Sequence, residues 1–365
     1  MIAVIPLRAG SKSIPHKNVR EIGGRPLAAW VIEASLNAAS VTRTVVSTDD
    51  PLVSGIYQGF LERWGPEAIT LHDRSPETAT DTASTESVLL EVVRSGLGDD
   101  DVICLLQATS PLTTERDIDA AWALFESGRW DSVLSVVPQH RFIWEARADG
   151  ARPLNYDPAA RPRRQDMAPL LVENGAIYIT STRALVQSDS RLSGRVGLYQ
   201  MPAHTYVELD EPEDWERLEP VVREARRRNL RAEAAAIELV LSDVDGVLTD
   251  AGMYWSSDGA ESKRFSARDG KGFELLHQAG IRTGLLTSEA VDLVRRRAEK
   301  LGTSVALGCA DKLAEADRLR IEAGLSWRQI AYIGDDVHDL ELMAAVGLSA
   351  APADALPRVL SLIHI

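Results

Sequence analysis

The sequence predicts an α/β protein with two doubly wound domains, each built on a mostly parallel sheet. Short apolar runs such as IAVIPL, RTVVST and DVICLLQ alternate with amphipathic helical stretches, which is the pattern of consecutive βαβ units. A second series of the same kind begins at IELVLSDVDGVLTD, after a charged stretch without a strand pattern. The 365 residues are enough for two domains that each bury a hydrophobic core.

Strands and helices can be placed along the chain from these patterns. The first series continues with DSVLSVV and GAIYIT, and we expect each run to be a strand. Residues 211–236 are rich in charge and alanine, a composition that favours helix. We therefore expect a first domain at residues 1–228, a helical linker at 229–236 and a second domain at 237–365. Further strands of the second domain are expected in IRTGLLTSE and QIAYIGDDV.

Composition limits the classes of partner. The formal net charge of −14 disfavours binding to nucleic acid or to an anionic membrane, because both would be repelled. The two cysteines, Cys104 and Cys309, fit neither a metal knuckle nor a disulfide framework, which suits a reducing compartment. There is no apolar run of bilayer length and no signal-peptide pattern. We expect a cytoplasmic protein that acts on small molecules.

The loop RAGSKSIPHKN follows the first predicted strand, at the sheet edge where open α/β folds bind ligands. Backbone N–H groups near Gly10 and Ser11 can cradle a phosphate, and Arg8, Lys12 and Lys17 can add charged hydrogen bonds. The spacing is not that of a nucleoside triphosphatase loop. A solvated surface turn is the alternative interpretation.

Further polar residues recur in the same domain. Arg74 lies in LHDRSPETATDTAST, and Gln107 lies in LLQATSPL at the end of another predicted strand. The segment RPRRQD contains Arg164 and precedes ENGAIYI, which contains Asn174. Residues from separate strand ends can meet at one edge of a parallel sheet, so these stretches favour a ligand site over a surface turn.

These stretches, in this order, resemble the N-acylneuraminate cytidylyltransferases, whose first loop reads R-x-G-S-K-x-I-P-x-K-N. PLNYDPAARPRRQD is similar to the matching segment of the animal members, and the resemblance covers nearly all of the first 215 residues. It implies a Rossmann-like nucleotidyltransferase fold that joins CTP to a nonulosonate and releases pyrophosphate. The implied CTP-binding residues are Arg8, Gly10, Ser11, Lys12, Lys17, Asn18, Arg74 and Ser84. The implied sugar-binding residues are Gln107, Arg164 and Asn174.

The same resemblance implies a metal pair. VELDEPEDW matches the Asp-x-Asp motif of the family at Glu208 and Asp210, with glutamate in place of the first aspartate. Both residues offer hard oxygen ligands for Mg²⁺, although an acidic cap at a helix start would look similar. In this family the anomeric 2-hydroxyl attacks the α-phosphorus of CTP. We expect Arg8, Lys12, Lys17 and Mg²⁺ to offset the charge on the phosphate oxygens.

The second domain contains acidic residues at strand ends. In LSDVDGVLTD, Asp243 and Asp245 lie two residues apart after a predicted strand, so both side chains point the same way and can reach one metal ion. A simple D-x-D-G turn is the alternative. Other polar residues that follow predicted strands favour a site: Thr287, Lys312, Asp335 and Asp336.

This set resembles the haloacid dehalogenase phosphatases, in particular the capless branch that acts on 3-deoxy-octulosonate 8-phosphate or nonulosonate 9-phosphate. The resemblance implies that Asp243 is a nucleophile that forms an aspartyl-phosphate, and that Asp245 is the general acid and then the base. Thr287 and Lys312 would hold the phosphoryl oxygens. The implied Mg²⁺ ligands are Asp243, Asp245 through its backbone carbonyl, Asp335 and Asp336.

Specificity is expected in two segments. Asp269 in ARDGKG matches an aspartate of the family's substrate loop. In LLTSEAVDLVRRRAEKL, Glu289, Arg297 and Lys300 resemble phosphatases of 2-keto-3-deoxynononate (Kdn) 9-phosphate, whereas octulosonate phosphatases read T-G-R here. On one helix these three side chains would share a face, since offsets of 8 and 11 residues rotate by about 80° and 20°. An ordinary charged helix surface is the alternative.

Relative to these phosphatases the chain differs in Ser288, which replaces a glycine, and in its end, ALPRVLSLIHI, which lacks a Gly-Gly-Arg-Gly segment. We expect a shortened tail. The combined interpretation is a bifunctional enzyme that dephosphorylates a nonulosonate 9-phosphate, Kdn 9-phosphate foremost, and activates the product with CTP. The alternatives are a second domain that serves only in oligomerisation and an octulosonate enzyme. The resemblance implies a homodimer or a homotetramer.

Overall fold

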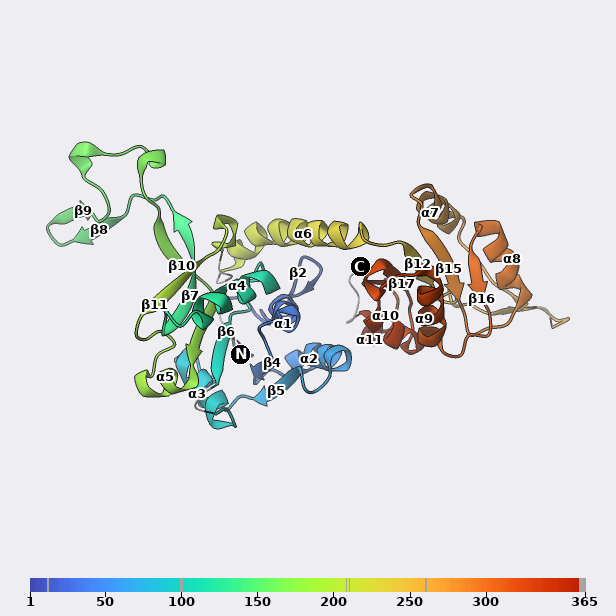
Figure 1. The fold of residues 1–365 in the computed structure, drawn as a ribbon, viewed down its shortest axis with the longest axis horizontal. Coiled ribbons are helices and arrows are strands. Elements are labelled where there is room, and N and C mark those ends of the chain that lie inside the picture. Colours follow the sequence, from blue (N-terminus) through green and yellow to red (C-terminus); the bar gives the residue numbers. More distant parts are fainter. Residues whose placement is uncertain (12, 99–100, 208, 210, 260, 361–365) are drawn as a thin grey trace. The chain divides into compact units, whose positions relative to one another are not determined.

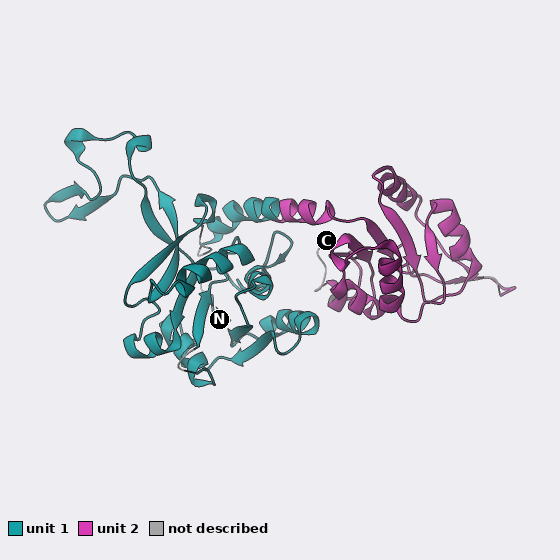
Figure 2. Cartoon of the chain, in the orientation of Figure 1, with its two compact units in different colours: residues 1–225 teal, residues 226–365 magenta. Residues whose placement is uncertain are grey.

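The computed structural model describes residues 1–11, 13–98, 101–207, 209, 211–259 and 261–360. It is an α/β fold with two mostly parallel sheets, which confirms the predicted fold class (Figure 1). The chain divides into two compact units, residues 1–225 and 226–365 (Figure 2). Helix α6 (Pro212–Ala234) begins in the first unit and ends in the second. No helix among the described residues is long and apolar enough to cross a membrane.

The first unit is built on a seven-stranded sheet with the order β11-β7-β10-β6-β1-β4-β5. Only β10 runs antiparallel to its neighbours, β6 and β7. The strands are β1 (Ile2–Leu7), β4 (Arg43–Thr48), β5 (Ile69–Asp73), β6 (Val102–Leu106), β7 (Ser132–Gln139), β10 (Leu170–Ser181) and β11 (Val196–Gln200). The central strands are nearly continuous apolar runs because helices cover both faces of the sheet.

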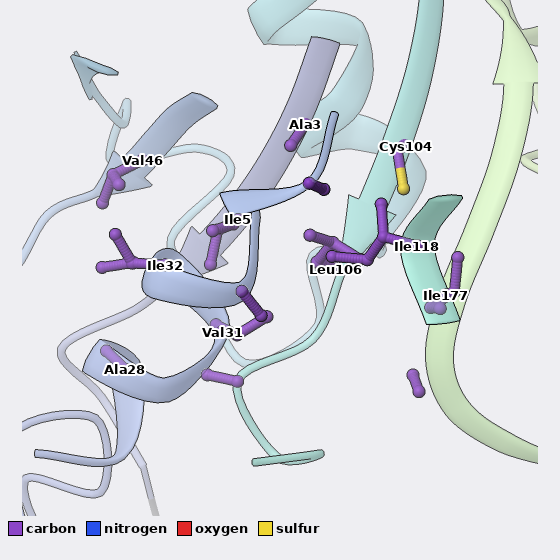
Figure 3. Close-up of a cluster of buried hydrophobic side chains, with 14 of the residues drawn as sticks. Ala3, Ile5, Ala28, Val31, Ile32, Val46, Cys104, Leu106, Ile118 and Ile177 are labelled. Atoms are coloured by element: carbon purple, nitrogen blue, oxygen red, sulfur yellow. The ribbon is translucent and has the colours of Figure 1, made fainter. Parts of the chain in front are cut away.

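Among the described residues, the helices that cover this sheet are α1 (Leu27–Asn37), α2 (Pro51–Trp64), α3 (Thr85–Arg94), α4 (Glu115–Glu126) and α5 (Thr182–Ser188). Helices α1, α2 and α4 contribute to one core cluster, in which Ile5, Ile32 and Leu106 lie close together (Figure 3). Helices α3 and α5 contribute to the cluster on the opposite face. The loops that follow β1, β4 and β6 all leave the sheet at the same edge, because these strands are parallel.

Three smaller features complete the first unit. A short ribbon of β2 (Glu21–Ile22) and β3 (Arg25–Pro26) precedes α1. Between β7 and β10 the chain leaves the sheet and forms a second ribbon, β8 (Trp144–Arg147) with β9 (Gly150–Pro153) (Figure 1). The first half of α6 packs on the loop after β1, because Trp215 and Leu218 share a buried cluster with Ile14.

The second unit is built on a five-stranded parallel sheet with the order β16-β15-β12-β17-β18. The strands are β12 (Leu239–Ser242), β15 (Arg282–Leu286), β16 (Ser304–Ala306), β17 (Ile330–Ile333) and β18 (Leu348–Ala350). Helices α7 (Ala267–Gln278) and α8 (Asp292–Leu301) pack on one face. Helices α9 (Lys312–Ala323), α10 (Leu340–Ala345) and α11 (Pro357–Leu360) pack on the other. A hairpin of β13 (Tyr254–Trp255) and β14 (Glu261–Ser262) follows β12.

One glycine of the second unit gives a direct test of packing. Gly347 donates its N–H to the carbonyl of Trp327 at 2.8 Å, and a Cβ at this position would lie 2.4 Å from the carbonyl oxygen of Arg328. We expect Gly347→Ala to lower the free energy of unfolding by about 1–3 kcal/mol, since the backbone must move to relieve the overlap. Urea denaturation of the full chain measures this change.

Gly272→Ala is the matched control. Gly272 lies inside α7, and a Cβ there would meet no atom of the described residues within 4 Å. We expect that substitution to raise stability by about 0.5–1 kcal/mol, because alanine loses less backbone entropy in a helix. Equal effects of the two substitutions would contradict the packing argument.

Candidate active sites

A cavity of about 280 Å³ lies at the carboxyl edge of the first sheet. Most of its lining residues lie in the segments that follow β1, β5 and β6. In the sequence the lining residues range from Pro6 to Thr109. Six of them are residues that the sequence singled out: Arg8, Ser11, Lys17, Asn18, Arg74 and Gln107. The parallel sheet therefore brings the first loop together with the Arg74 and Gln107 segments.

The first loop is fixed by hydrogen bonds, some of them made by residues that line the cavity. Asn18 is buried, and its Nδ2 donates to the carbonyl oxygen of Arg8 at 2.9 Å. The Nζ of Lys17 donates to the carbonyl oxygen of Leu209 at 2.8 Å, and the backbone N–H of Ala9 donates to Asp49 Oδ1 at 2.9 Å. Gly10 is exposed and does not belong to the lining. These bonds hold the loop in shape without a ligand.

An ion pair lies within this cavity. Arg8 Nη1 contacts Asp81 Oδ1 at 2.9 Å, and both side chains are partly exposed. The guanidinium of Arg74 is half-buried, and its Nε donates to the carbonyl oxygen of Thr78 at 3.0 Å. Glu91 of α3 accepts from the backbone N–H of Ser75 at 2.8 Å and so fixes the segment that carries Arg74. The cavity is rich in cations, and Arg8 among them is paired with a carboxylate.

Several predicted residues of the first unit lie elsewhere. Ser84 does not line the cavity, although its neighbours do, because its Oγ caps α3 by accepting from the N–H of Ser87. Arg164 begins a short 3₁₀ turn, Arg164–Asp166, outside the lining, and its side chain is exposed. Lys12, Glu208 and Asp210 lie outside the residues that the structure describes.

Asn174, which the sequence predicts to bind the substrate, lies in the core and is not among the residues that line the cavity. The side chain is fully buried, its Oδ1 accepts from Ser135 Oγ at 2.6 Å, and its Nδ2 donates to Thr205 Oγ1 at 3.1 Å. Asn174 lies within an irregularity in the pairing of β10 with β7, between Glu173 and Tyr178. Asn174 therefore stabilises the sheet beside the cavity.

In the second unit, three carboxylates converge after β12 and β17. Asp243, Asp335 and Asp339 each offer an oxygen within 4.8 Å of the others. Burial and the nearby Asp339 raise the pKa of Asp243 to about 6, and burial and Asp243 raise the pKa of Asp335 to about 6. Desolvated carboxylates in mutual repulsion favour a proton or a cation.

This cluster fits a divalent metal ion. Asp335 Oδ1 is buried and has no hydrogen-bond partner among the described residues. Gly246 leaves the necessary space, because a Cβ there would lie 1.8 Å from Asp335 Oδ2. Carboxylate oxygens are the ligands that Mg²⁺ prefers in proteins.

Lys312 lies beside these acids at the start of α9. Its Nζ is 2.9 Å from Asp243 Oδ2 and 2.7 Å from Asp339 Oδ1. Burial alone would lower the pKa of Lys312, but the two carboxylates raise it above its usual value. Asp339 also accepts from the Tyr332 hydroxyl at 2.5 Å and from the N–H of Asp335 at 3.0 Å. Lys312 is thereby fixed against Asp243 as an ammonium.

The third acid of this group is Asp339, which the sequence pattern did not single out, whereas Asp336, which it did, is not part of the group. Asp336 is exposed, and its Oδ1 caps its own turn by accepting from the N–H of Val337 at 2.5 Å. The available signal was the spacing in GDDVHD, where Asp339 lies about one turn after Asp335. Because a helical turn follows the strand, the side chain of Asp339, and not that of Asp336, reaches Lys312.

Asp245 and Thr287 flank the carboxylate cluster. Asp245 Oδ1 contacts the ammonium of Lys263 at 2.7 Å and accepts from Thr249 Oγ1 at 3.3 Å, so its side chain is not part of the three-acid group. Thr287 is buried, and its Oγ1 accepts from the N–H of Glu289 at 3.1 Å. Both lie after strands that neighbour each other in the sheet.

The shared helix face predicted for Glu289, Arg297 and Lys300 is wrong. Helix α8 begins at Asp292, so Glu289 lies in the loop before it, where its carboxylate pairs with Lys263. Lys300 is exposed. No local pattern marks where this helix starts, since Val291 provides no side-chain cap.

Arg297 and Asp269 lie close enough to interact. The charge of Arg297 opposes the effect of burial on Asp269, whose pKa is raised by that burial. Asp269 Oδ2 and Arg297 Nε are both buried without a hydrogen-bond partner among the described residues. Arg297 Nη2 donates to the carbonyl oxygen of Ser266 at 2.7 Å, and its guanidinium lies 5.3 Å from the ring centre of Phe265.

Comparisons with known proteins agree with both halves of the chain. A family model described as cytidylyltransferase matches residues 2–232. N-acylneuraminate cytidylyltransferase A of Danio rerio is 34% identical over 365 residues, which cover 97% of this chain and 81% of that protein. The N-acylneuraminate cytidylyltransferase of Oncorhynchus mykiss is 33% identical, with coverage of 97% and 81%.

A further relative matches only part of the chain. The 3-deoxy-D-manno-octulosonate 8-phosphate phosphatase of Yersinia pestis is 41% identical over 132 residues, which cover 36% of this chain and 71% of that protein. The resemblance to haloacid dehalogenase phosphatases is thus confirmed alongside the resemblance to the transferases. The chain belongs to the N-acylneuraminate cytidylyltransferase family and carries a C-terminal unit of the haloacid dehalogenase-like phosphatase type.

Proposed function

We propose that the first unit transfers CMP from CTP to a nonulosonate, either Kdn or N-acetylneuraminate, and releases pyrophosphate. The observation that supports this most directly is the cavity that gathers Arg8, Lys17 and Arg74 at one sheet edge. A triphosphate is an anion of the size and charge that such a group of cations favours. The printed names of the fish relatives point to the same reaction.

The residues of the chain have separable tasks in this reaction. Arg8 exchanges Asp81 for phosphate oxygens, and Lys17 stays fixed by the carbonyl of Leu209 while its charge offsets the leaving pyrophosphate. The 2-hydroxyl oxygen of the sugar forms a bond to the α-phosphorus, the bond from that phosphorus to the oxygen bridging to the β-phosphate breaks, and the hydroxyl proton is released to solvent. Mg²⁺, when bound, adds positive charge at the phosphate oxygens.

We further propose that the second unit hydrolyses a nonulosonate 9-phosphate, with Kdn 9-phosphate favoured. Support comes from Lys312, which contacts Asp243 and can hold a phosphoryl oxygen beside it. A carboxylate oxygen of Asp243 attacks phosphorus, the ester P–O bond breaks, and Asp245 gives a proton to the departing sugar oxygen. Water then attacks the aspartyl-phosphate, Asp245 accepts its proton, and phosphate leaves. The product is the substrate of the first unit.

A second unit that serves only in oligomerisation is the alternative. Such a unit would not need Asp243, Asp335 and Asp339 in repulsive proximity, nor Lys312 buried among them. Octulosonate 8-phosphate remains the competing substrate, because the Yersinia pestis relative bears that name. Glu289 supports the nonulosonate, since an acceptor replaces the arginine that the T-G-R segment of octulosonate phosphatases would provide here.

The transferase is tested by pyrophosphate release from CTP with Mg²⁺ and either Kdn or N-acetylneuraminate. We expect Arg8→Met to lower kcat/KM for CTP by roughly tenfold to a hundredfold, the value of one charged hydrogen bond. Arg94→Met is the control, because Arg94 is exposed at the end of α3. Absence of pyrophosphate with both sugars in the wild-type protein would refute the transferase proposal.

The phosphatase is tested by phosphate release from Kdn 9-phosphate, N-acetylneuraminate 9-phosphate and octulosonate 8-phosphate. We expect Asp243→Asn to lower kcat by more than about a thousandfold, because an amide is a poor nucleophile. Asp317→Asn on α9 is the control, since Asp317 pairs with Arg320 at the surface. Unchanged activity in Asp243→Asn would exclude the covalent route.

Metal binding to the carboxylate cluster should depend on pH. The pKa values of Asp243 and Asp335, both raised from 3.8 to about 6, mean that protonation stabilises the folded unit and that this stabilisation is lost as pH rises through 6. We therefore expect Mg²⁺ to raise the Tm of the full chain more at pH 7.5 than at pH 5, measured against NaCl of equal ionic strength. Asp335→Asn should reduce the difference, and a larger Mg²⁺ effect at pH 5 would contradict it.

A further inference from the structure

Lys263 is a second ammonium, besides Lys312, beside the reacting groups of the second unit. Its side chain is only 2% exposed, whereas its two partners, Asp245 and Glu289, are 33% and 35% exposed. The Nζ of Lys263 contacts Asp245 Oδ1 at 2.7 Å and also pairs with Glu289 Oε2. One buried cation therefore joins two carboxylates that face the solvent side of the site.

The backbone fixes where this cation lies. Lys263 directly follows β14, which pairs with β13 through Tyr254 and Ser262. Two residues later, Phe265 forms a β-bridge with Thr249, in the loop that follows Asp245. The segment of Lys263 is thus attached to the Asp245 loop on one side and to the hairpin on the other. Its side chain has little freedom to leave the two carboxylates.

The two partners have different places in the proposed reaction. Asp245 carries the proton for the departing oxygen, and Glu289 is the carboxylate that distinguishes this unit from the T-G-R pattern. They come from loops after different strands, β12 and β15, and without a cation between them their charges would repel. A substrate hydroxyl bound at Glu289 would therefore be placed relative to Asp245 by Lys263.

We propose that Lys263 is a positioning residue that holds the acid–base carboxylate Asp245 and the substrate-selecting carboxylate Glu289 in one geometry. This inference rests on the proposed phosphatase activity of the second unit. Lys263 does not touch the phosphoryl group in it; it acts through its two partners. Loss of the ammonium therefore affects proton delivery to the leaving group as well as recognition of the sugar.

Substrates with different leaving groups distinguish proton delivery by Asp245 from phosphoryl transfer to Asp243. A sugar phosphate releases a basic alkoxide that needs the proton of Asp245, whereas p-nitrophenyl phosphate releases a weakly basic phenoxide that does not. We expect Lys263→Met to lower kcat/KM for the sugar phosphate by roughly a hundredfold or more, the scale of general acid catalysis. For p-nitrophenyl phosphate we expect a loss below about fivefold, since phosphoryl transfer to Asp243 still proceeds.

A double-substitution cycle distinguishes the effect of Lys263 on Asp245 from its effect on Glu289. Glu289→Gln should raise KM for the sugar phosphate and lower kcat/KM for p-nitrophenyl phosphate to a smaller extent, because that ester has no sugar hydroxyl. Adding Lys263→Met to it should lower kcat for the sugar further, and the combined loss should be smaller than the product of the single losses. No further loss in the double variant would mean that Lys263 acts on Glu289 alone and would overturn the proposal.

Arg264→Met is the matched control, because Arg264 is the next residue and its side chain, 74% exposed, pairs with Asp250. It should leave both substrates unaffected. Lys263→Gln, which keeps a donor, serves if Lys263→Met does not fold, as judged by circular dichroism and urea denaturation. Equal losses for both substrates in a folded variant would show a merely structural role. A wild-type protein inactive on every phosphate ester would refute the phosphatase itself.

Discussion

Parallel pairing is the constraint on which both candidate sites depend. Every parallel strand must be followed by a crossover, so loops that are distant in the chain emerge at the same edge of the sheet. In the first unit this joins the loop after β1 to the segments after β5 and β6. In the second unit it joins the loops after β12, β15 and β17. The strands must be apolar because helices cover both faces of each sheet. The loops at the carboxyl edge have no such requirement and can contain charged residues.

This constraint explains which parts of the sites were predictable. Residues directly after a strand, such as Asp243, Asp335 and Gln107, were placed correctly at a carboxyl edge because the apolar run marks where the strand ends. Asp339 lies one turn further along, and choosing it over Asp336 requires knowing the geometry of that turn. The burial of Asn174 is harder to predict, because it lies within an irregularity of β10 where simple alternation does not show which face a side chain occupies.

Other features depend on contacts that no local pattern contains. Lys263 meets Asp245 across 18 residues and Glu289 across 26, and it follows a two-residue strand that gives no periodic signal. Glu289 was assigned to a helix that begins only at Asp292. In both cases the charge and the residue type were visible in the sequence, whereas the partner was decided by the tertiary fold.

The ion pair of Arg8 with Asp81 has a consequence for how the first unit responds to its medium. Both side chains are partly exposed, so dissolved ions weaken their attraction as they weaken the attraction between Arg8 and a polyanion. The two effects oppose each other, since a weaker internal pair releases Arg8 more easily. Nucleotide affinity should therefore vary less with ionic strength than it would if Arg8 had no internal carboxylate partner.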